Sequence, residues 1–205
     1  MIAVIDYEVG NLRSVEKAFA CLGYEAIVTS DPRVVLEAEK VILPGVGAFG
    51  KSMEALNRAG MIPVVKQVIQ SGRPFLGICL GLQLLFDESC EVFGNRERSN
   101  PGLGIFPGKV RRFPAGELKV PQIGWNQISI NKETPLFNGV PDGSFVYFVH
   151  SYYVEPDNPG IVACSTNYGI DYCSGIVSGN VAAFQFHPEK SSRVGLQILK
   201  NFAAL

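Results

Sequence analysis

Residues 74–86 read PFLGICLGLQLLF, an apolar strand that runs through Gly77, Cys79 and Gly81 into the start of a helix. A strand, a GxCxG turn and a helix form the pattern of a nucleophile elbow, here with cysteine in the position of serine. Glycines suit a tight turn that leaves no room for Cβ atoms beside the nucleophile and that needs a backbone angle glycine tolerates. A helix N-terminus favours the thiolate. We predict that Cys79 is a nucleophile; a buried structural cysteine is the alternative.

The segments around this elbow predict a βαβ arrangement. Strands are expected at residues 2–5, 26–28, 41–43 and 75–78, and helices at 12–20 and 62–69. After about residue 100 the pattern is strand-like, at 109–113, 127–130, 145–154, 161–164 and 181–186, and a closing helix covers 191–205. No repeat or long linker divides the chain. We expect one α/β domain, residues 1–205, with a mixed, largely parallel central sheet flanked by helices.

Charge and hydropathy exclude several classes of partner. The 205 residues include 18 Lys and Arg against 19 Asp and Glu, with no basic run, so neither a nucleic acid nor a membrane surface is expected as a partner. No apolar stretch is long enough to cross a bilayer, and Asp6 interrupts the N-terminal apolar run before a signal-peptide core forms. The sequence therefore predicts a cytoplasmic protein.

The cysteines predict neither disulfides nor a metal site. There are five, an odd number, with irregular spacing and no paired CxxC pattern. We expect reduced thiols, no metal and no cofactor.

A cysteine nucleophile needs a base, and the sequence has two histidines, His150 and His187. Residues 184–190 read FQFHPEK, where Pro188 forces an extended turn that lets His187 and Glu189 project the same way. This favours His187 as the base and Glu189 as the carboxylate that orients it. His150 is the competing base, although its strand-like surroundings equally suit a core or pocket-wall residue.

A glycine-rich loop, LPGVGAFG at residues 43–50, follows an expected strand. Such a loop can offer backbone N–H groups to a developing negative charge. It also spells GxGxxG, but a dinucleotide site is disfavoured because that motif usually follows the first strand of a sheet.

With these residues in place, the chain resembles the class I (triad) glutamine amidotransferases, whose marks are a GxCxGxQ elbow and a late HPE. Within that family it is similar to the branch that supplies ammonia for histidine biosynthesis. The matching stretches are 5–7, 10–12, 14–15, 44–49, 124–126, 147–152 and 186–191, with Gly195-Leu196 after them. Glu8 and Gln122-Ile123 depart from the usual pattern, outside the triad.

The resemblance implies that Cys79 attacks the side-chain amide of glutamine, that His187 transfers protons and that Glu189 orients the imidazole. It implies an oxyanion hole and substrate contacts beside them. The oxyanion donors are the backbone N–H groups of Leu80 and of the loop at Val46 and Gly47, and the substrate contacts are Gln83, Glu91, Ser151 and Tyr152.

The resemblance also implies a heterodimer partner, a (β/α)₈-barrel cyclase that receives the ammonia. Asn11, Trp125, Tyr147 and Lys190 match positions at or near that interface in the family.

Three alternatives stay open on sequence alone: a glutaminase that feeds another synthase (for pyridoxal phosphate or anthranilate), a cysteine-elbow hydrolase or related peptidase, and a non-catalytic binding module. The peptidase group usually carries histidine directly after the cysteine, where this chain has Leu80.

Overall fold

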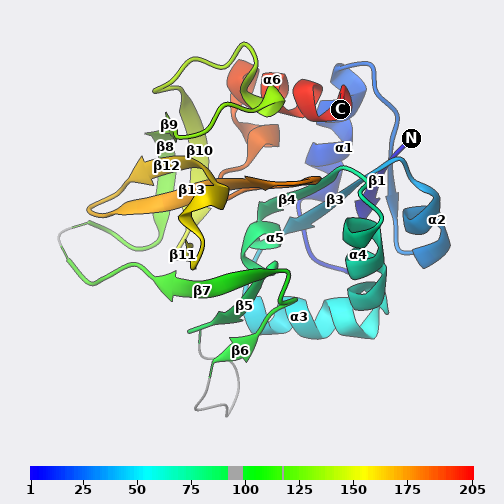
Figure 1. Ribbon diagram of the computed structural model, residues 1–205, viewed down its shortest axis with the longest axis horizontal. Coiled ribbons are helices and arrows are strands. Elements are labelled where there is room, and N and C mark those ends of the chain that lie inside the picture. Colours follow the sequence, from blue (N-terminus) through cyan, green and yellow to red (C-terminus); the bar gives the residue numbers. More distant parts are fainter. Residues whose placement is uncertain (92–98, 117) are drawn as a thin grey trace.

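The computed structural model describes residues 1–91, 99–116 and 118–205. At its centre lie five parallel strands in the order β2-β1-β3-β4-β14 (Figure 1). Their bounds are Ile2–Ile5 (β1), Ala26–Thr29 (β2), Lys40–Gly45 (β3), Phe75–Cys79 (β4) and Val181–Phe184 (β14). Parallel strands covered on both faces read as continuous apolar runs, as β1 and β4 do here.

Helices cover both faces of these strands. On one face lie α1 (Leu12–Cys21) and α6 (Ser192–Ala203), and on the other α2 (Pro32–Glu37), α3 (Phe49–Arg58) and α4 (Met61–Gln70). Successive side chains of β1 alternate between the two faces. Ile2 and Val4 share an apolar cluster with α1 and α6, whereas Ala3 and Ile5 share the other cluster with α2, α3 and α4. The core therefore has two halves, one on each side of the sheet.

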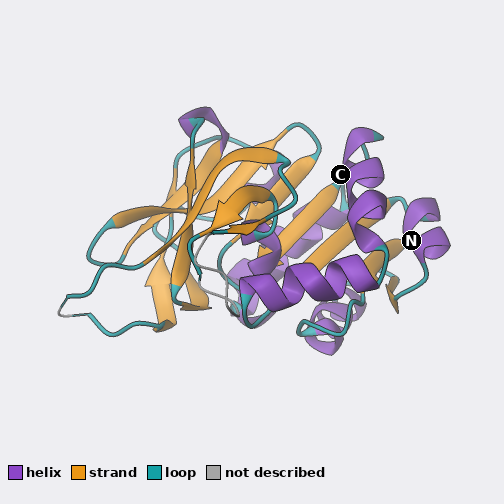
Figure 2. Ribbon diagram, turned by 90° about the horizontal axis from the view of Figure 1, so that it is seen from below, coloured by secondary structure: helices purple, strands orange, loops and turns teal. Residues whose placement is uncertain are grey.

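Further strands, mostly in antiparallel pairs, extend the sheet beyond β14, away from most of the helices (Figure 2). The sheet has twelve strands in the described part of the chain. The added strands are Phe86–Ser89 (β5), Asn100–Pro101 (β6), Phe106–Arg112 (β7), Ser129–Ile130 (β9), Tyr152–Pro156 (β11), Val162–Asn167 (β12) and Asp171–Ser178 (β13). Short 3₁₀ helices cover Pro135–Phe137, Pro159–Ile161 and Pro188–Lys190. The expected α/β class with a mixed sheet is confirmed.

The structure differs from the expected elements in several places. Helices α2 and α3 and the short strands β5 and β6 are not in the predicted set. The glycine-rich loop before α3 masks the start of that helix. The expected strand at 145–154 is two strands, β10 (Phe145–His150) and β11, divided at Ser151. Strand β10 pairs with β8 (Gln122–Gln127) in a separate two-stranded sheet, which we call the ribbon. No glycine or proline marks the break at Ser151, so the apolar run gives no sign of it.

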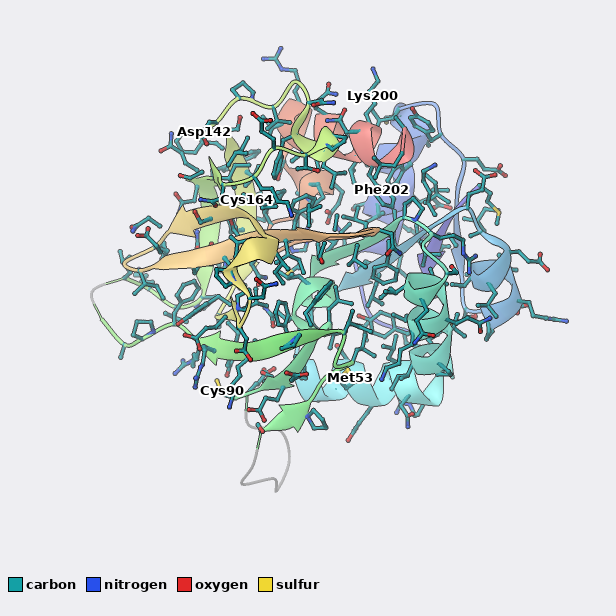
Figure 3. All side chains as sticks on the ribbon, in the orientation of Figure 1. Met53, Cys90, Asp142, Cys164, Lys200 and Phe202 are labelled. Carbon is teal, nitrogen blue, oxygen red and sulfur yellow. The ribbon has the colours of Figure 1, made fainter. Side chains whose placement is uncertain are left out.

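Every cysteine is a free thiol. Cys21 and Cys90 are exposed, and Cys79, Cys164 and Cys173 are buried. Figure 3 shows Cys164 among the packed side chains and Cys90 near the edge of the molecule. Among the described helices, none has the length and hydropathy needed to cross a membrane.

The turn from β4 into α5 (Leu80–Gln83) is closely packed. A Cβ atom on Gly81 would lie 1.9 Å from the carbonyl oxygen of Leu43, and one on Gly77 would lie 2.9 Å from Cβ of Ala183. Neither glycine has a positive φ; Cys79 itself does, with φ 54° and ψ −109°. The glycines are therefore required for close approach, while the nucleophile carries the unusual backbone angle.

This packing predicts that Gly81→Ala destabilises the protein, because a methyl group would collide with a backbone atom that no rotamer change can move. We expect a loss of about 3 kcal/mol or more in the free energy of unfolding, measured by urea titration. Gly116→Ala is the control, since a Cβ there meets nothing within 4 Å. Equal effects of the two substitutions would contradict the steric explanation.

Candidate active site

The site lies at the carboxyl ends of the parallel strands, where ligands bind in open α/β sheets. The register pairs Gly45 at the end of β3 with Cys79 at the end of β4, so the loop that starts at Val46 lies beside the elbow. On the other side of β4, Phe184 pairs with Ile78, and the chain then continues toward His187. Three segments distant in the sequence thus meet at one edge.

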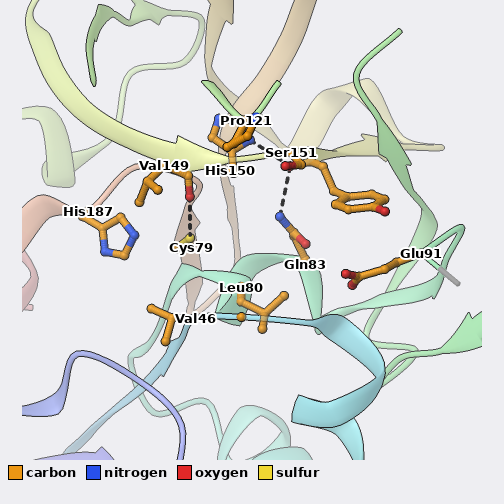
Figure 4. A pocket seen from close by; sticks show the side chains of 12 residues that line it. Val46, Cys79, Leu80, Gln83, Glu91, Pro121, Val149, His150, Ser151 and His187 are labelled. Carbon is orange, nitrogen blue, oxygen red and sulfur yellow. Dashed lines mark hydrogen bonds between the residues drawn. The ribbon is translucent and has the colours of Figure 1, made fainter. Parts of the chain in front are cut away.

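A cavity of about 390 Å³ opens at this edge (Figure 4). It brings together nine of the residues predicted from sequence and three others, Pro121, Val149 and His150. The nine are Val46, Gly47, Cys79, Leu80, Gln83, Glu91, Ser151, Tyr152 and His187. In Figure 4, His187 lies on one side of Cys79, and Gln83 and Glu91 lie on the other.

Cys79 is the last residue of β4 and directly precedes α5, and it is 5% exposed. Its Sγ lies 4.0 Å from the carbonyl oxygen of Val149 and 3.6 Å from Nε2 of Gln185. Cys79 is thus at the N-terminal end of a helix, a position that favours negative charge.

His187 and Glu189 form a buried pair. Nδ1 of His187 lies 2.8 Å from Oε1 of Glu189, and the two side chains are 1% and 0% exposed. Among the described residues, Nε2 of His187 has no hydrogen-bond partner. Because a carboxylate only accepts, Nδ1 carries a proton, and Nε2 is the nitrogen available for chemistry.

Two opposed effects act on the pKa of His187. Burial lowers it, but the adjacent Cys79 sulfur and the Glu189 carboxylate outweigh burial and raise it above its ordinary value. These interactions favour the imidazolium form of His187 beside Cys79, the form that can donate a proton to a leaving group.

The backbone around His187 is held at both ends. Its N–H donates to the carbonyl oxygen of Tyr147 at 2.9 Å, and its carbonyl oxygen accepts from Oγ of Ser191 at 2.6 Å. Ser191 Oγ in turn accepts from the N–H of Tyr147 at 2.9 Å. Pro188 opens the 3₁₀ turn that brings Glu189 back under the imidazole.

His150 has both ring nitrogens occupied. Nδ1 lies 2.8 Å from the carbonyl oxygen of Tyr152 and Nε2 lies 3.2 Å from the hydroxyl of Tyr172. Burial lowers the pKa of His150 to about 4, against the smaller opposing effect of the hydrogen bond to Tyr152 and with a smaller contribution from His187 in the same direction. His150 is a neutral residue of the cavity wall, and within the described part of the chain only His187, of the two histidines, has an unpartnered nitrogen.

A buried tyrosine, Tyr7, holds the end of β3, where the glycine-rich loop begins. The hydroxyl of Tyr7 donates to the carbonyl oxygen of Pro44 at 2.8 Å, and Tyr7 is 1% exposed. Gly47 has φ 90°, which side chains rarely adopt. Val46 and Gly47 line the cavity, as Leu80 does.

At the other end of the cavity, Glu91 accepts a hydrogen bond from the N–H of Phe49, 2.6 Å from Oε2, at the start of α3. The Nε2 of Gln83 donates to the carbonyl oxygen of Tyr152 at 3.0 Å. This end offers a carboxylate and backbone polar groups, which suit the ammonium and carboxylate of an amino acid. Among the described residues, no group of three or more His, Cys, Asp or Glu could hold a metal.

The four residues matched to a partner interface lie around the ribbon and the His187 turn. Trp125 and Tyr147 are cross-strand partners with ring centroids 6.1 Å apart, and Trp125 is 53% exposed. Lys190 is exposed at the end of the turn. Asn11 is half-buried, and its Nδ2 donates to Oε1 of Glu189 at 3.2 Å, a contact that sequence reasoning missed.

Comparison with known proteins agrees with this geometry. The family model for glutamine amidotransferase class-I matches residues 3–205. The chain belongs to this family.

Among its relatives is the imidazole glycerol phosphate synthase subunit HisH of Geobacter metallireducens, 56% identical over 98% of this chain and 97% of that protein. HisH of Chlorobaculum tepidum is 51% identical over 99% of both chains. The solved structure of PurLQS from Thermotoga maritima superposes with a TM-score of 0.76 at 17% identity, covering 99% of this chain and 97% of that one, which shows the shared fold.

The buried neutral His150 predicts a specific loss of stability in acid. Below pH 6.5 the unfolded chain protonates this residue before the folded chain does, so stability falls as the pH falls toward 4. Between pH 6.5 and 4.5 we expect His150 to account for a loss of about 2 kcal/mol, which His150→Asn removes from the pH dependence of urea unfolding.

His187→Asn is the control, because the raised pKa of His187 affects stability only above pH 6.5. If both variants keep the full acid dependence of the parent, His150 is not the group responsible.

Proposed function

We propose that this chain is the glutaminase subunit of imidazole glycerol phosphate synthase. It hydrolyses glutamine to glutamate and passes ammonia to a (β/α)₈-barrel cyclase subunit, which forms imidazole glycerol phosphate and AICAR in histidine biosynthesis. One observation carries the chemistry: His187, with Nδ1 on Glu189 and with Nε2 unpartnered among the residues that the structure describes, lines the same cavity as Cys79. Relatives above 50% identity over nearly the whole chain support the choice of synthase.

The first half of the reaction forms a thioester. The Cys79 thiolate adds to the amide carbon of glutamine, and the negative charge moves to the amide oxygen. The N–H of Leu80 and one N–H of the Val46–Gly47 loop hold this oxyanion. His187 then gives its Nε2 proton to the nitrogen, the carbon–nitrogen bond breaks, and ammonia leaves.

The second half of the reaction hydrolyses the thioester and regenerates the Cys79 thiolate. Neutral His187 takes a proton from water, and the resulting hydroxide adds to the thioester carbon. The carbon–sulfur bond breaks, glutamate leaves, and the thiolate again faces an imidazolium. Glu189, with a fully buried side chain, holds the imidazole in one tautomer through both halves.

The polar end of the cavity would orient the amino acid. Glu91 pairs with the ammonium of glutamine, while Gln83 and the backbone of Ser151 and Tyr152 fix the rest of the chain. This places the side-chain amide toward Cys79, at the opposite end of the cavity.

The ribbon supplies the surface for the cyclase. Ile123, Trp125 and Phe145 are 64%, 53% and 54% exposed, a concentration of apolar area unusual for a free surface. Ile123 pairs with Val149 and Trp125 with Tyr147, so these side chains share one face of the ribbon. Val149 also lines the cavity, which makes the apolar face continuous with the site where ammonia is released. A cytoplasmic location stays a prediction.

This proposal predicts that Cys79→Ala and His187→Asn separate two activities. With glutamine as the nitrogen source, the assembled synthase should lose activity by several orders of magnitude, because no thioester forms. With added ammonium salt the cyclase reaction should continue near the parent rate, because the docking surface is intact. Product formation by the complex is the measurement, and Cys173→Ala, a buried thiol outside the site, is the control. Equal loss of both activities would contradict the division of labour.

A further prediction concerns dependence on the partner. We expect the chain alone to hydrolyse glutamine slowly and to gain about 10²- to 10³-fold with the cyclase and its nucleotide ligand, the effect of one oxyanion donor. The glycines around Val46 give the loop the freedom to aim or withdraw that donor. Glutamate release is measured for the chain alone, with the cyclase, and with cyclase plus ligand.

Trp125→Ala tests whether this gain depends on the ribbon. Loss of a buried interface tryptophan should weaken binding of the cyclase by about 30-fold or more, as measured by calorimetry. Leu205→Ala is the control, since Leu205 is 52% exposed at the far end of α6. Unchanged binding in Trp125→Ala, or equal rates in all three mixtures, would overturn the docking model.

A further inference from the structure

Gln185 is a buried polar residue that the mechanism above leaves without a role. It directly follows β14 and stands between Phe184 and Phe186, and it is 0% exposed. A buried amide is costly unless its polar atoms are paired. Both ends of this amide are paired, and one of the partners is the sulfur of Cys79.

The neighbouring groups determine which end of the amide faces the sulfur. The carbonyl oxygen of Tyr152 can only accept, so the Gln83 atom 3.0 Å from it is the donor Nε2. The same Nε2 lies 3.0 Å from Gln185, so Gln185 must turn its oxygen toward it. The Nε2 of Gln185 therefore points at Sγ of Cys79, 3.6 Å away.

His150 strengthens this anchor. Its Nδ1 donates to the same carbonyl oxygen of Tyr152 at 2.8 Å, so two donors hold that oxygen in place. Hydrogen bonds thus link an accepting backbone carbonyl oxygen, through two glutamine amides, to the nucleophile.

We propose that Gln185 is a catalytic hydrogen-bond donor to Cys79, which favours the thiolate over the thiol. The sulfur has an acceptor on one side, the carbonyl oxygen of Val149 at 4.0 Å, toward which a thiol can point its proton. Gln185 is the opposing donor, and hydrogen bonds to charged groups are the stronger ones.

This donor differs from His187 in one respect. The imidazole gives up its proton to ammonia, whereas an amide N–H keeps its proton through the whole cycle. Gln185 therefore favours the sulfur anion twice: before it attacks glutamine, and when it leaves the thioester on hydrolysis. This inference rests on the proposed function, since it assigns a role to Gln185 through the nucleophile Cys79.

The test is the pH dependence of Cys79 alkylation by iodoacetamide, in the full chain with Cys21→Ser and Cys90→Ser to remove the exposed thiols. Glutamine is absent, so substrate binding does not enter. In Gln185→Met, which keeps the volume and removes the donor, we expect the midpoint of the rate profile to move up by about one pH unit. At pH 7 the rate should fall about tenfold, while the plateau at high pH stays within about twofold.

Two further variants separate this role from a structural one. Gln83→Met removes the hydrogen bond that orients the Gln185 amide, so the midpoint should move in the same direction but by less. This variant tests the proposal even if Gln185→Met fails to fold. Gln67→Met, at an exposed position on α4, should leave the profile unchanged. A general disturbance of the site would lower the plateau instead of moving the midpoint.

The outcomes separate the inference from the proposed function. A reactive Cys79 with the same midpoint in the parent, Gln185→Met and Gln83→Met overturns the role of Gln185 and leaves the glutaminase standing. A parent Cys79 that reacts only like an ordinary thiol, with a midpoint near 8.5, contradicts the activated nucleophile itself.

Discussion

The whole site depends on one turn in which the chain passes from β4 into α5 with Cys79 at φ 54°. A non-glycine residue holds such an angle only where its surroundings determine it fully. Here the surroundings are the backbone carbonyl of Leu43 against Gly81 and Cβ of Ala183, on β14, against Gly77. These close contacts between the turn and the neighbouring strands fix the position of the Cys79 sulfur at the edge of the sheet. The other groups of the site surround that sulfur.

The residues around that sulfur reach it because parallel strands end at one edge. Val46 follows β3, Gln185 and His187 follow β14, and both strands are in register with β4. The base is then fixed by hydrogen bonds, since His187 is bonded to Glu189 and Glu189 to the half-buried Asn11. The imidazole is therefore held in one orientation, which is what proton transfer between donors and acceptors requires.

The sequence predicts the parts of this site that are marked by short motifs or apolar runs. The elbow at Cys79 and the HPE at His187 have recognisable spacing, and the apolar runs of β1, β3 and β4 lie within one or two residues of their observed bounds. The sequence does not predict features that depend on contacts between residues far apart in the chain. The division of β10 from β11 at Ser151 and the amide of Gln185 are decided by pairing across the fold, and the positive φ falls on Cys79 and not on the flanking glycines.

The ribbon has a mechanical consequence. Tyr147 presents its ring beside Trp125 on the exposed side, while its carbonyl oxygen holds the N–H of His187 at 2.9 Å and its N–H is bonded to Ser191, which also bonds the carbonyl of His187. Strand β10, whose Tyr147 ring contacts Trp125, thus also positions the backbone of His187. A displacement of Tyr147 is passed to the backbone of His187 by one direct hydrogen bond and by two more through the Ser191 hydroxyl, so a change at the outer face of the ribbon alters the position of the imidazole.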